Sequence, residues 1–311
     1  MKKKKVWPEE EILRIERDLS RLVPGGVTVG EPMDRHTTWR VGGKADLFVR
    51  PTTVDQVREV ICYVHSRGLP FHVIGNGSNL LVLDGGLRGV TMQLKDNFQG
   101  IKVRRPYITA LAGTLLTQVA KRAAACGLTG LEFAAGIPAT VGGAVVMNAG
   151  AFGSSVSERL QRVRVIRFDG QHIVFQREQL ENRYRRNPLP DKGVVVEAVF
   201  VLAPGDKEEI YRTMERYNEE RRRKQPLQWP NAGSVFKNPP GATAGELIEK
   251  AGLKGYTIGG AQISEQHANF IINTGKATAA DIVLLIRTVQ RRVAEKFGIV
   301  LEPEVKIIGE P

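Results

Sequence analysis

The chain has 311 residues, of which 42% are hydrophobic and 25% are charged, and its formal net charge is +12. No apolar run reaches the roughly 20 residues that a membrane-spanning helix needs, and the basic start MKKKK is not followed by the apolar stretch of a secretory signal. The composition therefore predicts a globular, cytoplasmic protein that does not insert into membranes.

The two cysteines, Cys62 and Cys126, both fall inside apolar helical patterns. This placement argues against a disulfide framework, and the histidines do not have the spacing of metal ligands. We therefore expect neither structural disulfides nor a metal site.

The positive charge favours anionic partners, which include nucleic acid, anionic lipid and phosphorylated small molecules. Basic residues are concentrated only at Lys2–Lys5 and at 219–224, and aromatic residues make up 6% without alternating with the basic ones. We expect both clusters to be solvated surface and no nucleic acid to bind. A nucleic-acid-binding protein is the alternative, and it predicts steep salt dependence and no chromophore.

The first third of the chain alternates between helical and strand patterns. Apolar spacing predicts a helix over 9–23, a strand over 45–51, an amphipathic helix over 52–68 and a strand over 70–75. The last three elements form a β-α-β unit.

The middle of the chain continues this mixture. We expect a helix over 114–127, a hairpin over 162–176 with its turn at Asp169-Gly170, a strand over 193–202 and a charged helix over 206–225. A domain boundary is predicted near residue 205.

The last part returns to an α/β pattern. Thr243 and Glu246 have the spacing of a capping box before a short helix. A long helix over 278–298 and a strand within 299–309 complete the chain.

The segment GNGSN, Gly75–Asn79, follows a predicted strand directly. Successive backbone N–H groups in such a turn can bind phosphate oxygens, and glycine leaves their approach free. An ordinary tight loop is the alternative interpretation.

A second glycine-rich segment, GIPATVGGAVVMNAGAFG, spans 136–153 and is dominated by small residues. It suits a backbone that lies flat against a planar ligand or a diphosphate, and a closely packed strand and turn is the alternative. Neither segment matches the Rossmann or P-loop glycine pattern, so those two labels do not apply, although nucleotide binding does.

Ser234 lies in NAGSVFKNP, residues 231–239, with no histidine nearby. It is therefore not an ordinary hydrolase nucleophile, and on its own it reads as a turn or cap residue.

Seven motifs in order give the chain a resemblance to a known family. They are TTWRVGGKADLFVRP (37–51), VIGNGSNLLV (73–82), GLEFAAGIPATVGGAVVMNAGAFG (130–153), YRRN (184–187), NAGSVFKNP (231–239), AGLKGYTIGGAQISEQHANFIIN (251–273) and LEPEVKIIG (301–309). From about residue 37 to its end the chain resembles the UDP-N-acetylenolpyruvoylglucosamine reductases, in the shorter form without an inserted tyrosine loop.

This resemblance implies an α+β fold. Its parts would be an N-terminal helical segment (1–34), an FAD-binding domain of the vanillyl-alcohol-oxidase (PCMH) type (35–205, with subdomains of about 35–97 and 98–205) and a C-terminal α/β substrate-binding domain (206–311). We expect a monomer.

The resemblance also implies a reaction. NADPH reduces FAD, and flavin N5 passes the hydride to the vinyl carbon of UDP-N-acetylglucosamine enolpyruvate, which gives UDP-N-acetylmuramate for peptidoglycan precursor synthesis. By the same resemblance, Arg185 binds the substrate carboxylate, Ser234 protonates the neighbouring carbon and Glu304 polarises the developing enol. Glu302 is a close competitor of Glu304, and the family motif selects Glu304.

Binding residues follow from the same motifs. Lys237 and Asn238 would bind phosphate and other polar groups of the substrate. The pyrophosphate of FAD would bind the first glycine-rich segment, and the flavin ring and ribityl chain would lie near the second. The FAD contacts implied are Gly75, Asn76, Gly77, Ser78, Asn79, Leu80, Gly136, Ile137, Thr140, Gly142, Gly143, Ala144, Asn148 and Gly150.

The chain departs from the family pattern at three positions. Asn76 replaces a glycine, and we expect the turn to survive because asparagine tolerates left-handed backbone. Ala139 also replaces a glycine, and Asn187 replaces a serine. His267 is assigned no catalytic role. Another FAD-dependent oxidase or dehydrogenase on the same scaffold is the alternative function, but it leaves 231–239 and 301–309 without a purpose.

Overall fold

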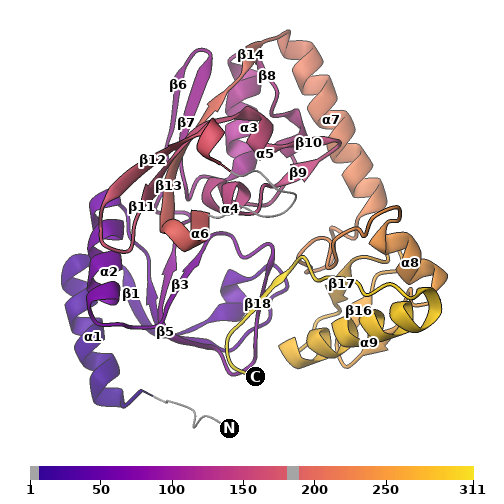
Figure 1. Ribbon diagram of the computed structural model, residues 1–311, viewed down its shortest axis with the longest axis horizontal. Coiled ribbons are helices and arrows are strands. Elements are labelled where there is room, and N and C mark those ends of the chain that lie inside the picture. The colour runs from indigo at the N-terminus through magenta and orange to yellow at the C-terminus, as the bar shows by residue number, and fades with distance from the viewer. Residues whose placement is uncertain (1–6, 181–188) are drawn as a thin grey trace. The chain divides into compact units, whose positions relative to one another are not determined.

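The computed structural model describes residues 7–180 and 189–311 (Figure 1). The chain forms two compact units. Unit 1 comprises Met1–Gly30, Asp46–Asn76 and Arg88–Glu220, and unit 2 comprises Glu31–Ala45, Gly77–Leu87 and Arg221–Pro311. This division differs from the predicted contiguous domains, because the chain passes between the units several times and the last passage falls inside a helix, α7 (Lys207–Lys224), rather than near residue 205.

The first sheet of unit 1 has the strand order β1-β2-β5-β3. Its strands are β1 (Val27–Pro32), β2 (Lys44–Val49), β5 (Leu87–Gln93) and β3 (Phe71–Ile74). The predicted strand, helix and strand are present as β2, α2 (Val54–Ser66) and β3, but β5 lies between the two strands and pairs with β3 in parallel.

Two helices accompany this sheet and pack side by side (Figure 1). In α1 (Glu9–Leu22), Ile15 and Leu19 are buried, as the apolar spacing predicts. Helix α2 begins after Thr53, whose side chain accepts a hydrogen bond from the Gln56 N–H.

The second sheet of unit 1 is antiparallel, with the order β12-β11-β13-β7-β6. Its strands are β6 (Ile101–Arg104), β7 (Tyr107–Leu111), β11 (Leu160–Ile166), β12 (His172–Gln176) and β13 (Val194–Val201). The predicted hairpin and the following strand are confirmed. The central strand β13 is almost wholly buried, which explains its continuous apolar sequence.

The other elements of unit 1 are short, apart from the predicted helix α3 (Leu116–Ala125). They are β8 (Leu128–Thr129), η2 (Glu132–Ala134), α4 (Val141–Val146), β9 (Gly150–Ala151), β10 (Ser154–Ser155), α5 (Val156–Arg159), η3 (Arg177–Gln179), α6 (Leu189–Lys192) and β14 (Ala203–Pro204).

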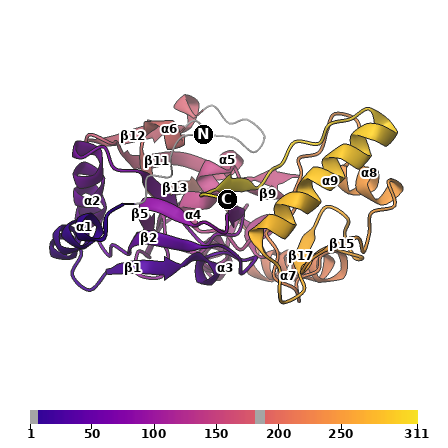
Figure 2. The same cartoon turned by 90° about the horizontal axis from the view of Figure 1, so that it is seen from below.

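Unit 2 is built on a three-stranded antiparallel sheet of β15 (Thr257–Ile258), β16 (Ala261–Ile263) and β17 (Ile271–Asn273). Helices α8 (Ala244–Lys250) and α9 (Ala279–Phe297) lie beside each other (Figure 2). Thr278 and Asp281 form a reciprocal capping box at the start of α9, and at α8 the Thr243 side chain accepts from the Glu246 N–H.

The end of the chain contributes a shorter strand than predicted. Only Lys306–Ile308 forms a strand, β18, which pairs in parallel with β4 (Leu80–Val82). Unit 2 also contains the short helix η1 (Met33–His36). In the segment 299–305, Pro303 makes an isolated bridge to Phe236 instead of joining a sheet.

Within the described residues, no helix is both long and apolar enough to span a bilayer. The same part of the chain contains no group of three or more His, Cys, Asp or Glu side chains that could bind a metal ion.

Candidate functional site

The start of the first glycine-rich segment, Gly75 and Asn76, meets the second segment within unit 1. A Cβ atom added at Gly75 would lie only 2.2 Å from the Thr140 hydroxyl oxygen, so glycine is required for the segments to approach this closely. Asn76 then donates from Nδ2 to the carbonyl of Pro138 over 2.6 Å. The residue that replaces a family glycine therefore links the two segments directly.

The backbone conformation of the first turn differs from the one expected. Gly77 has the positive φ, +66°, whereas Asn76 is not among the residues with positive φ. The turn survives because the left-handed position falls on Gly77, and the tolerance of asparagine for that conformation is not used. The boundary between the units also falls here, so Gly77, Ser78, Asn79 and Leu80 belong to unit 2.

The N–H groups of the two segments differ in their use. Among the hydrogen bonds of the described residues, none has the backbone N–H of residues 75–79 as its donor. In the second segment, the N–H groups of Val141 and Gly142 donate to Thr114 and Ala112, each over 2.8 Å. The first segment therefore retains the donors that a pyrophosphate requires, whereas these two N–H groups of the second segment are already bonded.

Part of the second segment forms a helix, α4 (Val141–Val146), which its glycine-rich composition does not predict. Thr140 is the N-cap of α4, and its hydroxyl accepts from the Gly143 N–H over 3.4 Å. This cap and the following backbone bonds stabilise a helix over 141–146 despite two glycines. Asn148 follows with φ +41°, and its side-chain oxygen accepts from the Ser157 N–H.

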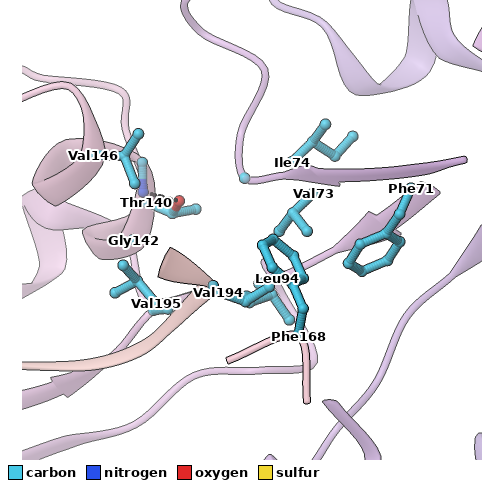
Figure 3. Close-up of a pocket in the computed structure, with 14 residues that line it drawn as sticks. Phe71, Val73, Ile74, Leu94, Thr140, Gly142, Val146, Phe168, Val194 and Val195 are labelled. Atoms are coloured by element: carbon cyan, nitrogen blue, oxygen red, sulfur yellow. Dashed lines mark hydrogen bonds between the residues drawn. The ribbon is translucent and has the colours of Figure 1, made fainter. Parts of the chain in front are cut away.

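A cavity of about 310 Å³ lies beside these segments in unit 1. Figure 3 shows Val73 and Ile74 of β3 on one side of it and Thr140 and Val146 of α4 on the other. The remaining walls are mostly apolar and include Phe71, Leu94, Phe168, Val194 and Val195. A planar ring of a nucleotide cofactor fits such walls, and Gly75, the first residue of the turn with unused N–H groups, is part of the lining.

Ser234 lies in unit 2 and is half-buried. The residues that follow it, Val235 and Phe236, are 0% and 2% exposed and anchor its backbone. The Glu304 N–H donates to the Val235 carbonyl over 2.8 Å. This hydrogen bond joins the segments that carry two of the three predicted catalytic residues, Ser234 and Glu304. The two residues are 70 positions apart in the sequence.

Contacts separate Glu304 from its competitor. Residues two apart in an extended chain face the same side, so strand alternation cannot distinguish Glu302 from Glu304. Glu302 is mostly exposed and forms an ion pair with Lys237, whereas Glu304 is half-buried next to the Ser234 segment. The partial burial of Glu304 beside the Ser234 segment favours it over the exposed Glu302.

The two predicted substrate-binding residues already have protein partners. Lys237 forms the ion pair with Glu302, and the Asn238 Oδ1 accepts from the Ala244 N–H over 3.0 Å at the start of α8. No described residue bonds the Asn238 NH₂ group, which can therefore be offered to a ligand, whereas Lys237 would have to exchange or share its carboxylate. Arg185 lies outside the described residues.

Sequence reasoning missed one residue beside Ser234. Asn269 contacts Val235 and Phe236 through three hydrogen bonds. It belongs to the motif SEQHANF, in which His267 is the obvious candidate for a functional residue because histidine is the usual acid or base. Burial lowers the pKa of His267, and its Nδ1 accepts from the Asn269 N–H over 3.2 Å, so this histidine supports the structure as a neutral ring.

The fold and the first site define a flavoprotein. Residues 45–176 match the family described as FAD binding domain, which is consistent with an apolar cavity beside a turn of unused N–H groups. The predicted α+β fold of the PCMH type with a separate C-terminal domain is confirmed.

The chain belongs to the UDP-N-acetylenolpyruvoylglucosamine reductase family. Residues 225–308 match the C-terminal domain of this reductase. The chain is 48% identical to the reductase of Moorella thermoacetica, over 91% of this chain and 94% of that one, and 45% identical to that of Listeria monocytogenes, over 91% and 95%. The crystal structure of the reductase MurB from Thermus caldophilus superposes with a TM-score of 0.78 at 38% identity, covering 90% of this chain and 97% of that one.

Proposed function

We propose that the protein uses NADPH and FAD to reduce the enolpyruvyl ether of UDP-N-acetylglucosamine enolpyruvate, giving the lactyl ether of UDP-N-acetylmuramate for peptidoglycan precursor synthesis in the cytoplasm. The observation that carries the proposal is the family membership, since the relatives match over nine tenths of the chain and include both units. The adjacency of Ser234 and Glu304 in unit 2 supports it independently.

The cofactor site is assigned to the two glycine-rich segments. When bound, FAD would supply the hydride chemistry that connects NADPH to the terminal vinyl carbon of the substrate. The N–H groups of residues 75–79 would bind the pyrophosphate, and the hydrogen bond from Asn76 to the Pro138 carbonyl keeps the start of this turn against the second segment. The apolar walls that include Val73, Phe168 and Val194 exclude water from a planar ring of the cofactor.

The remaining chemistry belongs to three side chains. Arg185 binds the substrate carboxylate and stabilises the negative charge that grows there as hydride arrives. The Ser234 hydroxyl gives its proton to the carbon next to that carboxylate. A hydroxyl is a weak acid, but this carbon is strongly basic in the enol intermediate and can accept the proton from it. Glu304 polarises the enol and orients the donor from the neighbouring segment.

The direct test is an anaerobic titration in two steps. The purified protein should contain FAD, NADPH should bleach the flavin absorbance, and UDP-N-acetylglucosamine enolpyruvate should restore it with formation of the lactyl ether. A reduced flavin that ignores this substrate but reacts rapidly with oxygen would replace the proposal with an oxidase or dehydrogenase. A colourless protein that cannot be reconstituted with FAD would reject both.

A further inference from the structure

The backbone immediately after Ser234 is held on two sides. On one side, Glu304 donates to the Val235 carbonyl over 2.8 Å, and the Lys237 N–H donates to the Glu302 carbonyl over 2.9 Å. On the other side, the hydrogen bonds made by described residues to Val235 and Phe236 come from Asn269. Among these residues, Asn269 therefore holds one side of this backbone by itself, as the segment 302–304 holds the other.

Asn269 bonds the segment three times. Its backbone carbonyl accepts from the Val235 N–H over 2.8 Å. Its side-chain oxygen accepts from the Phe236 N–H over 2.9 Å, and its NH₂ group donates to the Phe236 carbonyl over 2.8 Å. Together with Glu304, these contacts satisfy all four backbone polar groups of Val235 and Phe236.

Only an amide side chain can do this. The contact to Phe236 requires one donor and one acceptor at the same time, which a carboxylate and an alkyl group of similar size do not supply. Asn269 is 4% exposed, so an unmatched polar group there would be costly. Its geometry is fixed by His267, whose Nδ1 accepts from the Asn269 N–H and whose carbonyl accepts from the Phe270 N–H.

The neutral state of His267 is consistent with its surroundings. Burial lowers the pKa of this ring, its backbone hydrogen bond opposes that shift, and the charged groups that act on it are Lys254, Glu249 and Lys224. A ring without a proton on Nδ1 is the form that can accept from Asn269.

We propose that Asn269 is the positioning residue for proton transfer, because its three hydrogen bonds set the place of the Ser234 hydroxyl relative to Glu304. This inference depends on the proposed function. Asn269 is not assigned any contact with the substrate or the cofactor, and it acts only through the backbone that carries Ser234. Misplacing a catalytic group by about 1 Å can cost about 10²-fold in rate.

The test uses the holoenzyme and the isosteric change Asn269→Asp, with Asn269→Ala as a second variant. The rates of flavin reduction by NADPH and of flavin reoxidation by UDP-N-acetylglucosamine enolpyruvate are measured separately by stopped flow. We expect reoxidation to fall about 10- to 100-fold through kcat rather than KM, with reduction changed less than about twofold. In a Ser234→Ala background, the same substitution should change reoxidation less than about twofold, since the group it positions is absent.

The matched control is Asn273→Asp. Asn273 is also buried, at 5% exposed, and its amide bonds backbone groups of Trp39, Gly275 and Ala277 rather than the Ser234 segment. Asn273→Asp should lower thermal stability to a degree similar to Asn269→Asp, but it should not slow flavin reoxidation selectively.

Three outcomes would overturn the inference: an equal loss at Asn273→Asp, an equal loss in the Ser234→Ala background, or normal reoxidation in both Asn269 variants. If instead the unaltered protein fails to reduce the enolpyruvyl substrate, the proposed function itself fails, and the two failures are distinguishable.

Discussion

The turn at residues 75–79 and the segment after Ser234 use hydrogen bonding in opposite ways. The turn keeps its backbone N–H groups unused among the described residues, and it approaches its neighbour because Gly75 has no side chain. Every backbone polar group of Val235 and Phe236 is bonded, largely by the side chain and carbonyl of Asn269. Binding an anionic cofactor requires N–H donors that are free of protein partners. Positioning the Ser234 hydroxyl requires a backbone that hydrogen bonds hold in one conformation.

The largest effect on the turn is expected from Gly75→Ala. The new Cβ would lie 2.2 Å from the Thr140 hydroxyl oxygen, so the two glycine-rich segments must separate. Overpacking of this kind costs about 1–3 kcal/mol, which corresponds to FAD affinity weakened by about 5- to 150-fold, measured by flavin fluorescence during reconstitution.

The control for this change is Gly245→Ala in α8 of unit 2, which lies outside both glycine-rich segments. Its new Cβ would meet the His267 ring at an ordinary 3.4 Å and should leave FAD affinity nearly unchanged. Adding Thr140→Ala to Gly75→Ala should restore part of the affinity. Equal FAD binding by Gly75→Ala and the unaltered protein would show that the approach of the segments is not needed for the cofactor.

A smaller effect is expected from Asn76→Gly, although this substitution restores the residue of the family pattern. It removes the hydrogen bond from Nδ2 to the Pro138 carbonyl, and Gly77 already provides the left-handed position. The loss of about 1 kcal/mol predicts FAD binding that is about threefold to tenfold weaker in the same assay. Tighter binding by the glycine variant would mean that Asn76 hinders the cofactor.

The smallest effect tests a helix start in unit 2, away from either segment. Hydrogen bonds from Thr278 and Gly260 lower the pKa of Asp281, and the Thr278 backbone contributes most. Because the folded-state pKa is depressed, the ionised carboxylate stabilises the fold at neutral pH, and this contribution disappears as pH falls through that pKa.

Asp281→Asn should therefore lower the free energy of unfolding by about 1 kcal/mol at pH 7, measured by urea denaturation. The difference should shrink at pH values near and below the usual Asp pKa of about 3.9. Asp55→Asn in the first turn of α2 is the control. A difference that stays constant with pH would contradict the role of the charge.

Local signals predicted the longer elements well. Helices α2 and α9 each have an apolar stripe that begins a few residues after a threonine N-cap. Both signals are local, so the sequence predicts the bounds of these helices. Helix α4 was missed because two glycines lower its helix propensity, while its cap and its bonds to Ala112 and Thr114 come from the surrounding structure.

Long-range arrangement was harder to predict. The family motifs indicated Ser234 and Glu304 but not that one backbone hydrogen bond would join their segments. The function of Asn269 depends on contacts across 33 residues with a segment that has no periodic pattern. The two units are each assembled from three parts of the chain, which local periodicity does not report.

The central claim is that the Ser234 hydroxyl protonates the carbon next to the substrate carboxylate. The most direct measurement is anaerobic stopped flow on Ser234→Ala loaded with FAD. NADPH should reduce its flavin at the rate of the unaltered protein, and reoxidation by UDP-N-acetylglucosamine enolpyruvate should be slower by about 10²- to 10⁴-fold. Reoxidation at the normal rate would show that another group delivers the proton.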